Sequence, residues 1–207
     1  MHAWARQKGF SFSAAVDSHL PDQFPEFDFI RKGHNRKIFN LCSGIFKNYS
    51  VLAFDFTAQF GGNPSGFQMS FRRRKRKSAP RIKMYSAVVL EAPFELKPLV
   101  IRPEHLFDKL IAVFGFDDID FESKEFSSKF SVKSPDREWA QAVLHDQAIQ
   151  FLLRLNPTQT IVFEGNKVCL FRENSMEPLE LSRSLEVGSK LLDLLPESVR
   201  MSGQTRA

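Results

Sequence analysis

The chain has 207 residues, of which 26% are charged and 43% are hydrophobic, and this composition is typical of a globular protein. No signal peptide opens it, and no run approaches the roughly 18 apolar residues that a membrane-spanning helix needs, so we expect a soluble protein. The formal charge of +5 has a local origin, because the eight cations between residues 72 and 83 exceed it and the rest of the chain is slightly acidic.

Phenylalanine and cysteine usage adds two expectations. There are 22 Phe but only 2 Tyr and 2 Trp, and we expect most Phe rings in the core because they carry no polar group. The two cysteines, Cys42 and Cys169, lie far apart in apolar runs and lack the close spacing of metal ligands. We expect both to be buried thiols in a reducing compartment, which indicates a cytoplasmic protein.

The first half of the chain is predicted to contain mainly strands. A short helix at residues 2–9 is expected to end at Gly9, because glycine suits a helix C-cap. Residues 17–29 are predicted to form a loop with one helical turn, held in place by its Phe side chains. Alternating and apolar runs predict strands at residues 10–12, 37–46, 50–60 and 84–91, with the last two side by side.

The second half is predicted to contain mainly helices. Asp136, Asp146 and Ser182 are expected to cap three of them, because short polar side chains accept hydrogen bonds from free N–H groups. Gly165-Asn166 is predicted to form the turn of a β-hairpin. The helices are expected at residues 104–114, 123–130, 136–155 (two helices) and 183–195. The strands are expected at residues 99–102, 131–134, 160–163 and 168–171.

Strand runs and helix runs are segregated along the chain, which is typical of the α+β class. We therefore predict a single α+β domain over residues 1–200, with a largely antiparallel sheet built from hairpins and packed by helices. A basic loop insertion is expected at about residues 59–83, and residues 201–207 are expected to be a flexible tail.

An acidic joint follows the predicted helix at residues 104–114, and its four acids are Asp117, Asp118, Asp120 and Glu122. Carboxylates are ligands for Mg²⁺ and Ca²⁺, and they also serve in acid/base catalysis. The spacing differs from that of a calcium-binding loop, which needs a glycine at its sixth position. The alternative is a structural role, in which Asp120 or Ser123 caps the next helix and apolar neighbours anchor the joint.

The basic run is the second candidate site. Its cations suit contacts with the phosphates of anionic lipid or of nucleic acid, and the alternative is a solvated loop. Aromatic residues flank the run but none lies inside it, so stacking on bases is weakly supported. The candidate anion-contacting residues are Arg72, Arg73, Arg74, Lys75, Arg76, Lys77, Arg81 and Lys83.

Other chemistries find little support in the sequence. The five histidines are scattered without metal-ligand spacing, and no serine lies in a nucleophile elbow. The glycine-rich segment at residues 61–66 matches neither a phosphate-binding loop nor a dinucleotide fingerprint, so no cofactor is expected.

Most of the chain resembles a known family, and the resemblance is most specific in its middle. The residues that carry the resemblance are Ile101-Arg102-Pro103-Glu104, Gly115-Phe-Asp-Asp-Ile-Asp-Phe-Glu-Ser123, Phe130, Val132-Lys-Ser-Pro-Asp136 and Trp139-Ala140. This pattern is similar to that of an uncharacterised family of bacterial domains, whose members are often known only as hypothetical or membrane-associated proteins. The resemblance implies a domain that has no established activity and that is frequently placed behind membrane-spanning helices. Members of the family carry a shorter loop where this chain has residues 59–83.

These observations favour a non-catalytic binding or scaffold domain, peripheral at the cytoplasmic face of the membrane. Its expected partner is an anionic membrane surface or a protein, and the basic loop would supply the electrostatic contact. Two alternatives stay open. One is a metal-dependent enzyme that uses the acidic joint, and the other is a nucleic-acid-binding protein that uses residues 72–83.

Overall fold

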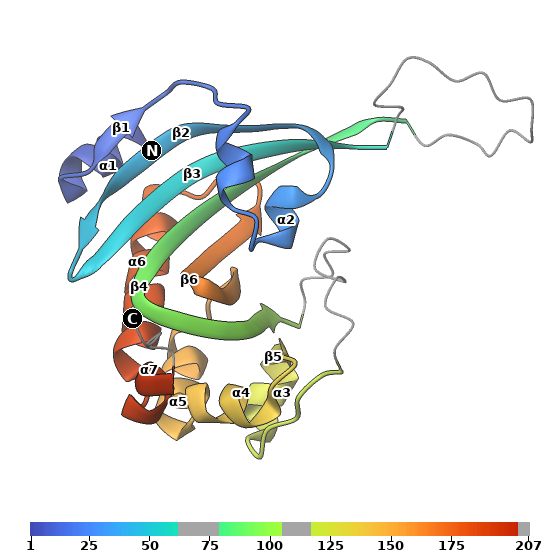
Figure 1. Cartoon of the computed structure of the whole chain (residues 1–207), viewed down its shortest axis with the longest axis vertical. Helices are drawn as coiled ribbons and strands as arrows, with labels where there is room; N and C mark the ends of the chain where they lie inside the picture. The colour runs from blue at the N-terminus through green and yellow to red at the C-terminus, as the bar shows by residue number, and fades with distance from the viewer. Residues whose placement is uncertain (62–78, 105–116, 203–207) are drawn as a thin grey trace, which may run out of the picture.

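A bent antiparallel sheet of six strands organises the fold, and helices pack against it (Figure 1). The computed structural model describes residues 1–61, 79–104 and 117–202. The strands are β1 (Ser11–Ser13), β2 (His34–Phe46), β3 (Tyr49–Phe60), β4 (Arg81–Pro103), β5 (Phe130–Lys133) and β6 (Thr160–Glu173). The helices are α1 (His2–Lys8), the 3-10 helix η1 (Leu20–Gln23), α2 (Asp28–Arg31), α3 (Lys124–Lys129), α4 (Arg137–Val143), α5 (Asp146–Leu155), α6 (Pro178–Leu194) and α7 (Glu197–Ser202). The predicted single-domain α+β class and its antiparallel sheet are confirmed.

Strand β4 is the centre of the sheet and pairs with three neighbours. Residues 81–91 pair with β3, residues 86–101 pair with β6, and residues 100–103 pair with β5. The register with β6 shifts on both sides of Leu96. Such irregularities bend a strand, and the bend of β4 is plain in Figure 1. One long strand therefore replaces the two that the sequence predicted at residues 84–91 and 99–102.

Strand β6 is also continuous, so the predicted hairpin at residues 160–171 is wrong. Gly165 lies opposite Leu96 and has a φ of 58°, which glycine adopts without strain. This conformation lets β6 follow the bend of β4 instead of reversing its direction. The dipeptide Gly165-Asn166 has the composition of a turn, but pairing with a distant strand decides its conformation.

One face of the sheet is covered by α1 and by the helices from α3 to α7, which share one apolar core with it. The close approach of α6 depends on Gly188, since a Cβ there would lie 2.5 Å from Leu90 Cδ1 and 2.9 Å from Leu170 Cδ1. Helix α1 is fixed by Trp4, which is 2% exposed and donates from Nε1 to Ser182 Oγ of α6 at 2.9 Å. The amino-terminal helix and α6 are thus held together.

The opposite face is covered by η1 and α2, which lie on the inner side of the bend of β4 (Figure 1). Its core is rich in aromatic rings, as the Phe content predicted. Phe29 stacks on Phe171 with ring centroids 3.7 Å apart, and it also meets Phe56 and Tyr85 edge-on. These rings anchor the segment between β1 and β2 on the sheet.

Two helix ends are as the sequence predicted. Gly9 ends α1 in the left-handed conformation with a φ of 71°. Asp136 caps α4, because its Oδ1 accepts a hydrogen bond from Trp139 N at 2.9 Å. Both features depend only on neighbouring backbone groups, so the sequence suffices to predict them.

Two other predicted caps are wrong. Ser182 lies inside α6, because this helix begins earlier, at Pro178. Glu177 and Glu180 form its capping box. The side chain of Glu177 accepts a hydrogen bond from the backbone N–H of Glu180, and the side chain of Glu180 accepts one from the backbone N–H of Glu177. Asp146 is the first residue of α5 rather than its cap.

Some predicted features lie outside the described residues. They are nearly all of the helix predicted at 104–114, most of the basic insertion, and the tail after Ser202. Met201 and Ser202 belong to α7. Across the three described ranges, no helix is both long enough and apolar enough to span a membrane.

Candidate functional site

The acidic joint is tied to the edge of the sheet at β5. Asp118 forms an isolated antiparallel bridge with Lys133, and Ile119 N donates to Val132 O at 2.8 Å. The carboxylate of Asp118 is used in the same attachment, because its Oδ1 accepts from Ser131 Oγ at 2.8 Å and lies 3.6 Å from Lys133 Nζ. Asp118 therefore fastens the joint to β5.

The other acids of the joint are exposed, and they do not gather with Asp118. They are Asp117, Asp120 and Glu122. In the described parts of the chain, no group of three or more His, Cys, Asp or Glu side chains is placed to hold a metal ion. Ser123 caps α3 by accepting a hydrogen bond from Phe126 N at 3.2 Å. The contacts of the joint are those of a capped and anchored connection.

The basic run is described only at its end, because residues 72–77 lie outside the described ranges. Arg81 is exposed at the start of β4, beside Ile82, which is 75% exposed. Lys83 Nζ lies 2.8 Å from Glu173 Oε2 of β6, so this cation already has an ion-pair partner. In Figure 1 the ends of β3 and β4 extend away from the helices, which places Arg81 at the margin of the domain.

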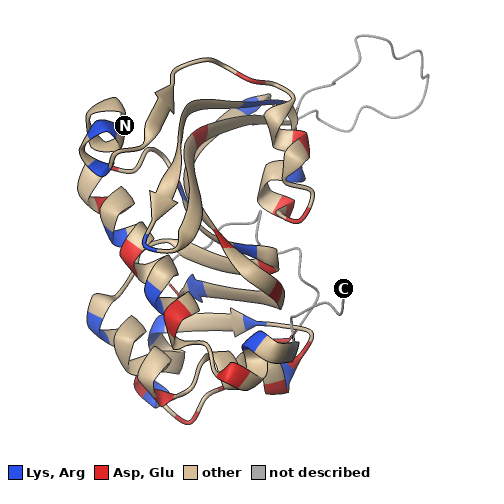
Figure 2. Ribbon diagram, turned by 60° about the vertical axis from the view of Figure 1, so that its left-hand side comes forward, with Lys and Arg blue, Asp and Glu red and all other residues tan. Residues whose placement is uncertain are grey.

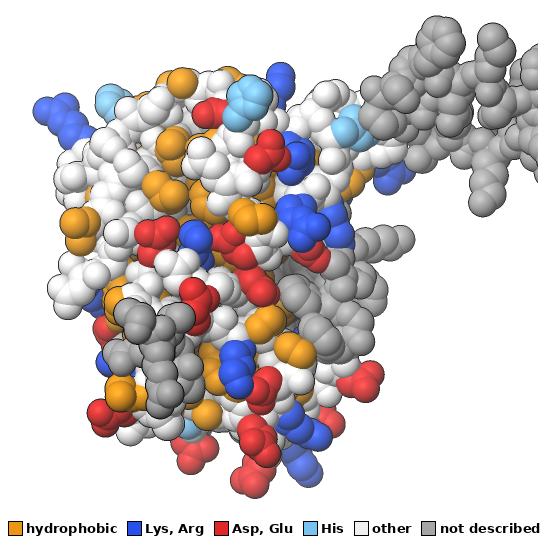
Figure 3. Space-filling model, viewed as in Figure 1, with side chains coloured by type: hydrophobic (Ala, Val, Ile, Leu, Met, Phe, Trp, Pro, Cys, Tyr) orange, Lys and Arg blue, Asp and Glu red, His pale blue; other side chains and the backbone are white. Residues whose placement is uncertain are grey.

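The other charges are mixed in sign. Lys and Arg as well as Asp and Glu are spread over most elements (Figure 2). On the face shown in Figure 3, basic and acidic side chains lie among one another over the coloured residues. A place where charges of one sign predominate therefore differs from the rest of the described surface and is a candidate binding site.

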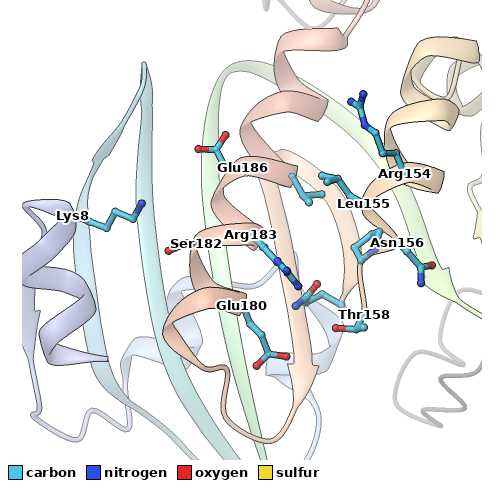
Figure 4. A pocket seen from close by; sticks show the side chains of 12 residues that line it. Lys8, Arg154, Leu155, Asn156, Thr158, Glu180, Ser182, Arg183 and Glu186 are labelled. Atoms are coloured by element: carbon cyan, nitrogen blue, oxygen red, sulfur yellow. The ribbon is translucent and has the colours of Figure 1, made fainter.

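A cavity of about 530 Å³ lies between α1, α6 and the end of α5 (Figure 4). This volume is within the range of pockets that hold small molecules. The local sequence forms it because α5 ends at Leu155, and Asn156 then adopts a φ of 46°, which turns the chain towards β6. The turn at residues 156–159 becomes one wall, and α6 becomes another.

Three cations line this cavity, and each comes from a different helix: Lys8 from α1, Arg154 from α5 and Arg183 from α6. Figure 4 shows Lys8 extending towards α6, and Arg183 extending from α6 towards the turn at residues 156–159. Within the described part of the chain, none of the three makes an ion pair or a side-chain hydrogen bond. Lys8 Nζ lies 5.7 Å from the centroid of the Phe46 ring, but none of the three cations has a counter-ion among the described residues, so their charges are available to an anion.

The two carboxylates of the lining are already neutralised by cations from outside it. Glu180 pairs with Arg172, and Glu186 Oε2 lies 3.3 Å from Lys47 Nζ. Once each of these pairs is counted as neutral, the lining keeps three positive charges. The cavity is thus an electropositive site on a surface of mixed charge.

Two neutral polar side chains complete the site. Gln159 is only 4% exposed and its carboxamide makes no hydrogen bond with any described residue, but the carboxamide is not among the buried polar atoms that lack a partner, so its polar atoms stay accessible from the cavity. A ligand hydroxyl in the cavity is therefore able to pair with this carboxamide, which carries both a donor and an acceptor. Ser182 Oγ accepts from Trp4 Nε1 at 2.9 Å, which leaves its own proton to be donated.

This cavity was not predicted from the sequence. Its walls come from Lys8, from residues 154–159 and from residues 180–187, and no motif joins these segments. The one local signal is Pro157, because proline disfavours continuation of the helix that precedes it, but this signal does not indicate what the following turn lines. Only the packing of α1 and α5 around α6 brings the three cations together.

Cys42 and Cys169 are buried free thiols, as the sequence predicted. Burial raises the pKa of Cys42 to about 11, and burial raises the pKa of Cys169 well above its ordinary value. Since the thiolate is the reactive form of cysteine, neither side chain is a nucleophile at neutral pH.

Glu164 of β6 lies near the acids of the α2 segment. Desolvation by burial, together with the negative charges of Asp28 and Glu26, raises the pKa of Glu164 to about 7. Glu26 is itself paired with Lys167, whose Nζ lies 2.8 Å from Glu26 Oε1. Glu164 therefore changes its charge near neutral pH.

Replacing Glu164 by glutamine is expected to stabilise the protein at pH 8 and to have little effect at pH 4. The folded state holds this proton up to a pKa of about 7, whereas the ordinary value is 4.5. The stability that the protonated carboxyl contributes is fully present below pH 4.5, and it is lost as the pH rises through 7. Urea unfolding at both pH values measures the difference.

The control for this prediction is Glu95→Gln, because Glu95 is an exposed acid on the neighbouring strand β4. This variant is expected to match the wild type at both pH values. If Glu164→Gln shows the same change of stability between pH 4 and pH 8 as the wild type, Glu164 does not titrate as described.

Comparison with known proteins gives a match at the level of fold. Neither a protein-family model nor a curated protein matches the sequence. The fold is similar to that of the mycobacterial trehalose monomycolate transport factor A, TtfA. The match to the crystal structure of TtfA covers 94% of this chain and 93% of the other, with a TM-score of 0.64 and 12% sequence identity.

At this identity the likeness to TtfA shows a shared fold. It extends over almost all of both chains, so it includes the bent sheet and the helices on its faces rather than one common motif. The resemblance of most of the chain to an uncharacterised bacterial family stays a prediction.

Proposed function

We propose that this chain is a non-catalytic binding domain that works at the inner face of a bacterial membrane as part of a transport assembly. The observation that carries the proposal is the fold shared with TtfA, a mycobacterial transport factor for trehalose monomycolate, over 94% of this chain. A likeness of this extent means that the whole architecture, and not one supersecondary unit, is common to the two proteins.

The described residues support binding over catalysis. All four acids of the joint are exposed, and the carboxylate of Asp118 is in addition held by Ser131 and Lys133. Both thiols are held in the protonated form by burial. Catalysis by acid, base or nucleophile requires such groups to converge in a cleft, and the described side chains of the joint do not have this arrangement.

The membrane contact is assigned to the connection between β3 and β4. Residues 72–77 are six consecutive cations, and each cation near an anionic membrane surface contributes about 1 kcal/mol. Arg81 continues this charge onto the described part of β4, and the exposed side chain of Ile82 adds apolar surface beside it. The strand ends extend beyond the body of the domain, which favours contact with a flat surface (Figure 1).

Neutralising four cations of this connection is expected to weaken binding to anionic vesicles on the order of 1,000-fold, at about 1 kcal/mol for each cation. The variant carries R73Q, R74Q, K75Q and R76Q. Sedimentation with vesicles of phosphatidylglycerol and phosphatidylcholine measures the partition. Vesicles of phosphatidylcholine alone are expected to bind weakly, and binding is expected to fall with salt because the contact is electrostatic.

A matched control removes four exposed cations that lie in helices α1, α3, α4 and α6. They are Arg6, Lys124, Arg137 and Lys190, each replaced by glutamine. Both variants lower the net charge from +5 to +1, so they differ only in where the charge is lost. The control is expected to keep most of its binding. An equal loss in the two variants, or no loss in the first, would sink the proposed contact. If the variant of residues 73–76 loses binding to a DNA duplex but keeps its binding to vesicles, the basic connection is a nucleic-acid contact instead.

A further inference from the structure

We infer that the cavity between α1, α5 and α6 binds a small phosphorylated polyol, either a free sugar phosphate or the headgroup of an anionic lipid. This site is separate from the β3–β4 connection, and it involves none of the residues assigned to the membrane contact above. The inference depends on the charge, the hydrogen-bonding groups and the size of the cavity.

The charge of the lining selects an anion. Lys8, Arg154 and Arg183 face one cavity without counter-ions, while the carboxylates of the lining are paired elsewhere. Like charges that share a site repel one another, and an anion placed among them relieves that repulsion. Two of the three are guanidinium groups, whose paired N–H donors match the oxygens of a phosphate.

The neutral groups select a ligand that carries hydroxyls as well as phosphate. The carboxamide of Gln159 is accessible from the cavity, offers both a donor and an acceptor, and makes no hydrogen bond with the described residues. Ser182 has a proton left to donate. A hydroxyl group donates and accepts, so it satisfies both side chains, whereas a bare phosphate offers mainly acceptors.

The size and the remaining walls fit a sugar-sized body. A cavity of about 530 Å³ is larger than inorganic phosphate needs, and it is typical of sites for small metabolites. Val187 is buried and Leu155 is 46% exposed, and both line the cavity. Their apolar surfaces suit the C–H face of a sugar ring.

Calorimetric titration of the full chain with glucose 6-phosphate, and with glucose as the uncharged probe, tests the site. Glucose 6-phosphate is expected to bind measurably more tightly than glucose. The double variant R154Q/R183Q is expected to lose about tenfold or more in affinity, because each arginine makes charge-assisted hydrogen bonds. Gln159→Leu, which keeps all three cations, is expected to weaken binding of the polyol phosphate but not the weak binding of inorganic phosphate.

The matched control is K124Q/R137Q, which removes the same charge from exposed positions outside the cavity. It is expected to bind glucose 6-phosphate like the wild type. Arg154 and Arg183 are exposed, so their variants are expected to fold, and unfolding curves check this.

A second arm distinguishes the two sources of the ligand. Vesicles containing phosphatidylglycerol are sedimented with the wild type, with R154Q/R183Q and with the variant of residues 73–76. Specific loss of vesicle binding in R154Q/R183Q supports a lipid headgroup, and loss of glucose 6-phosphate binding alone supports a free sugar phosphate. If R154Q/R183Q changes neither measurement, or if glucose binds as tightly as glucose 6-phosphate, the inference is overturned.

Discussion

A valine at position 188 is expected to lower the free energy of unfolding by about 3 kcal/mol or more. Gly188 faces the sheet from α6, and the space for a Cβ is already filled by Leu90 and Leu170, with distances of 2.5 and 2.9 Å. A branched side chain would push α6 away from β4 and β6, so apolar contacts along the whole helix would loosen together. Urea unfolding followed by circular dichroism measures the loss.

The control is Lys190→Val, which places the same side chain at an exposed position of the same helix. Its expected cost is about 0.5 kcal/mol, the difference in helix propensity. Gly188→Ala adds the Cβ alone, and its loss in the free energy of unfolding is expected to lie between those of Gly188→Val and Lys190→Val. A Gly188→Val protein as stable as Lys190→Val would show that α6 does not need this close approach.

Truncating Phe29 to alanine is expected to cost about 3–5 kcal/mol. Phe29 is 4% exposed, and its ring stacks on Phe171 of β6 at a centroid distance of 3.7 Å. It joins the α2 segment to the aromatic core on the inner side of the bend, so its removal leaves a cavity where two distant parts of the chain meet. The midpoint of thermal or urea unfolding reports the cost.

Ile45→Ala is the matched control, because it also removes a large apolar side chain but from a position that is 72% exposed. Its effect is expected to be within about 0.5 kcal/mol of zero, as for most surface substitutions. A second readout is limited proteolysis between β1 and β2, which Phe29→Ala is expected to accelerate. Unchanged stability together with unchanged cleavage would mean that Phe29 does not anchor this segment.

Features that depend on neighbouring residues could be predicted from the sequence. Gly9 ends α1 because glycine tolerates the left-handed conformation, and Asp136 caps α4 because its carboxylate reaches a backbone N–H three residues ahead. The strand pair formed by residues 50–60 and 84–91 was visible in apolar runs of matching length. In each case the deciding interaction is local or follows from burial of one face.

Features that depend on a distant partner could not be predicted in this way. Gly165 has the signature of a turn, yet it lies within a continuous strand because β4 is bent opposite it. Ser182 looks like a helix cap, yet it receives the indole N–H of Trp4, which is far away in sequence. The local sequence limits the conformations and contacts that a residue adopts, and tertiary packing decides which of them occurs.

The acidic joint and the cavity between α1, α5 and α6 also differ in how far the sequence alone reveals them. The acids of the joint stand out in the sequence because four of them lie within six residues, but Asp118 uses its carboxylate to attach the joint to β5. The cations of the cavity are inconspicuous in the sequence, because they come from α1, α5 and α6 and only the fold places them around one space. Clustering along the chain is therefore a poor guide to clustering in space for this protein.

The position of β4 has a consequence for biosynthesis. This strand leaves the ribosome well before β6, and until β6 arrives one edge of β4 presents free backbone N–H and C=O groups next to apolar side chains. Both layers of apolar packing also stay open in that interval, since each includes residues of β6. A nascent chain stalled or cut before Thr160 would therefore be prone to self-association and dependent on chaperones, whereas a chain complete through α7 would close both layers at once.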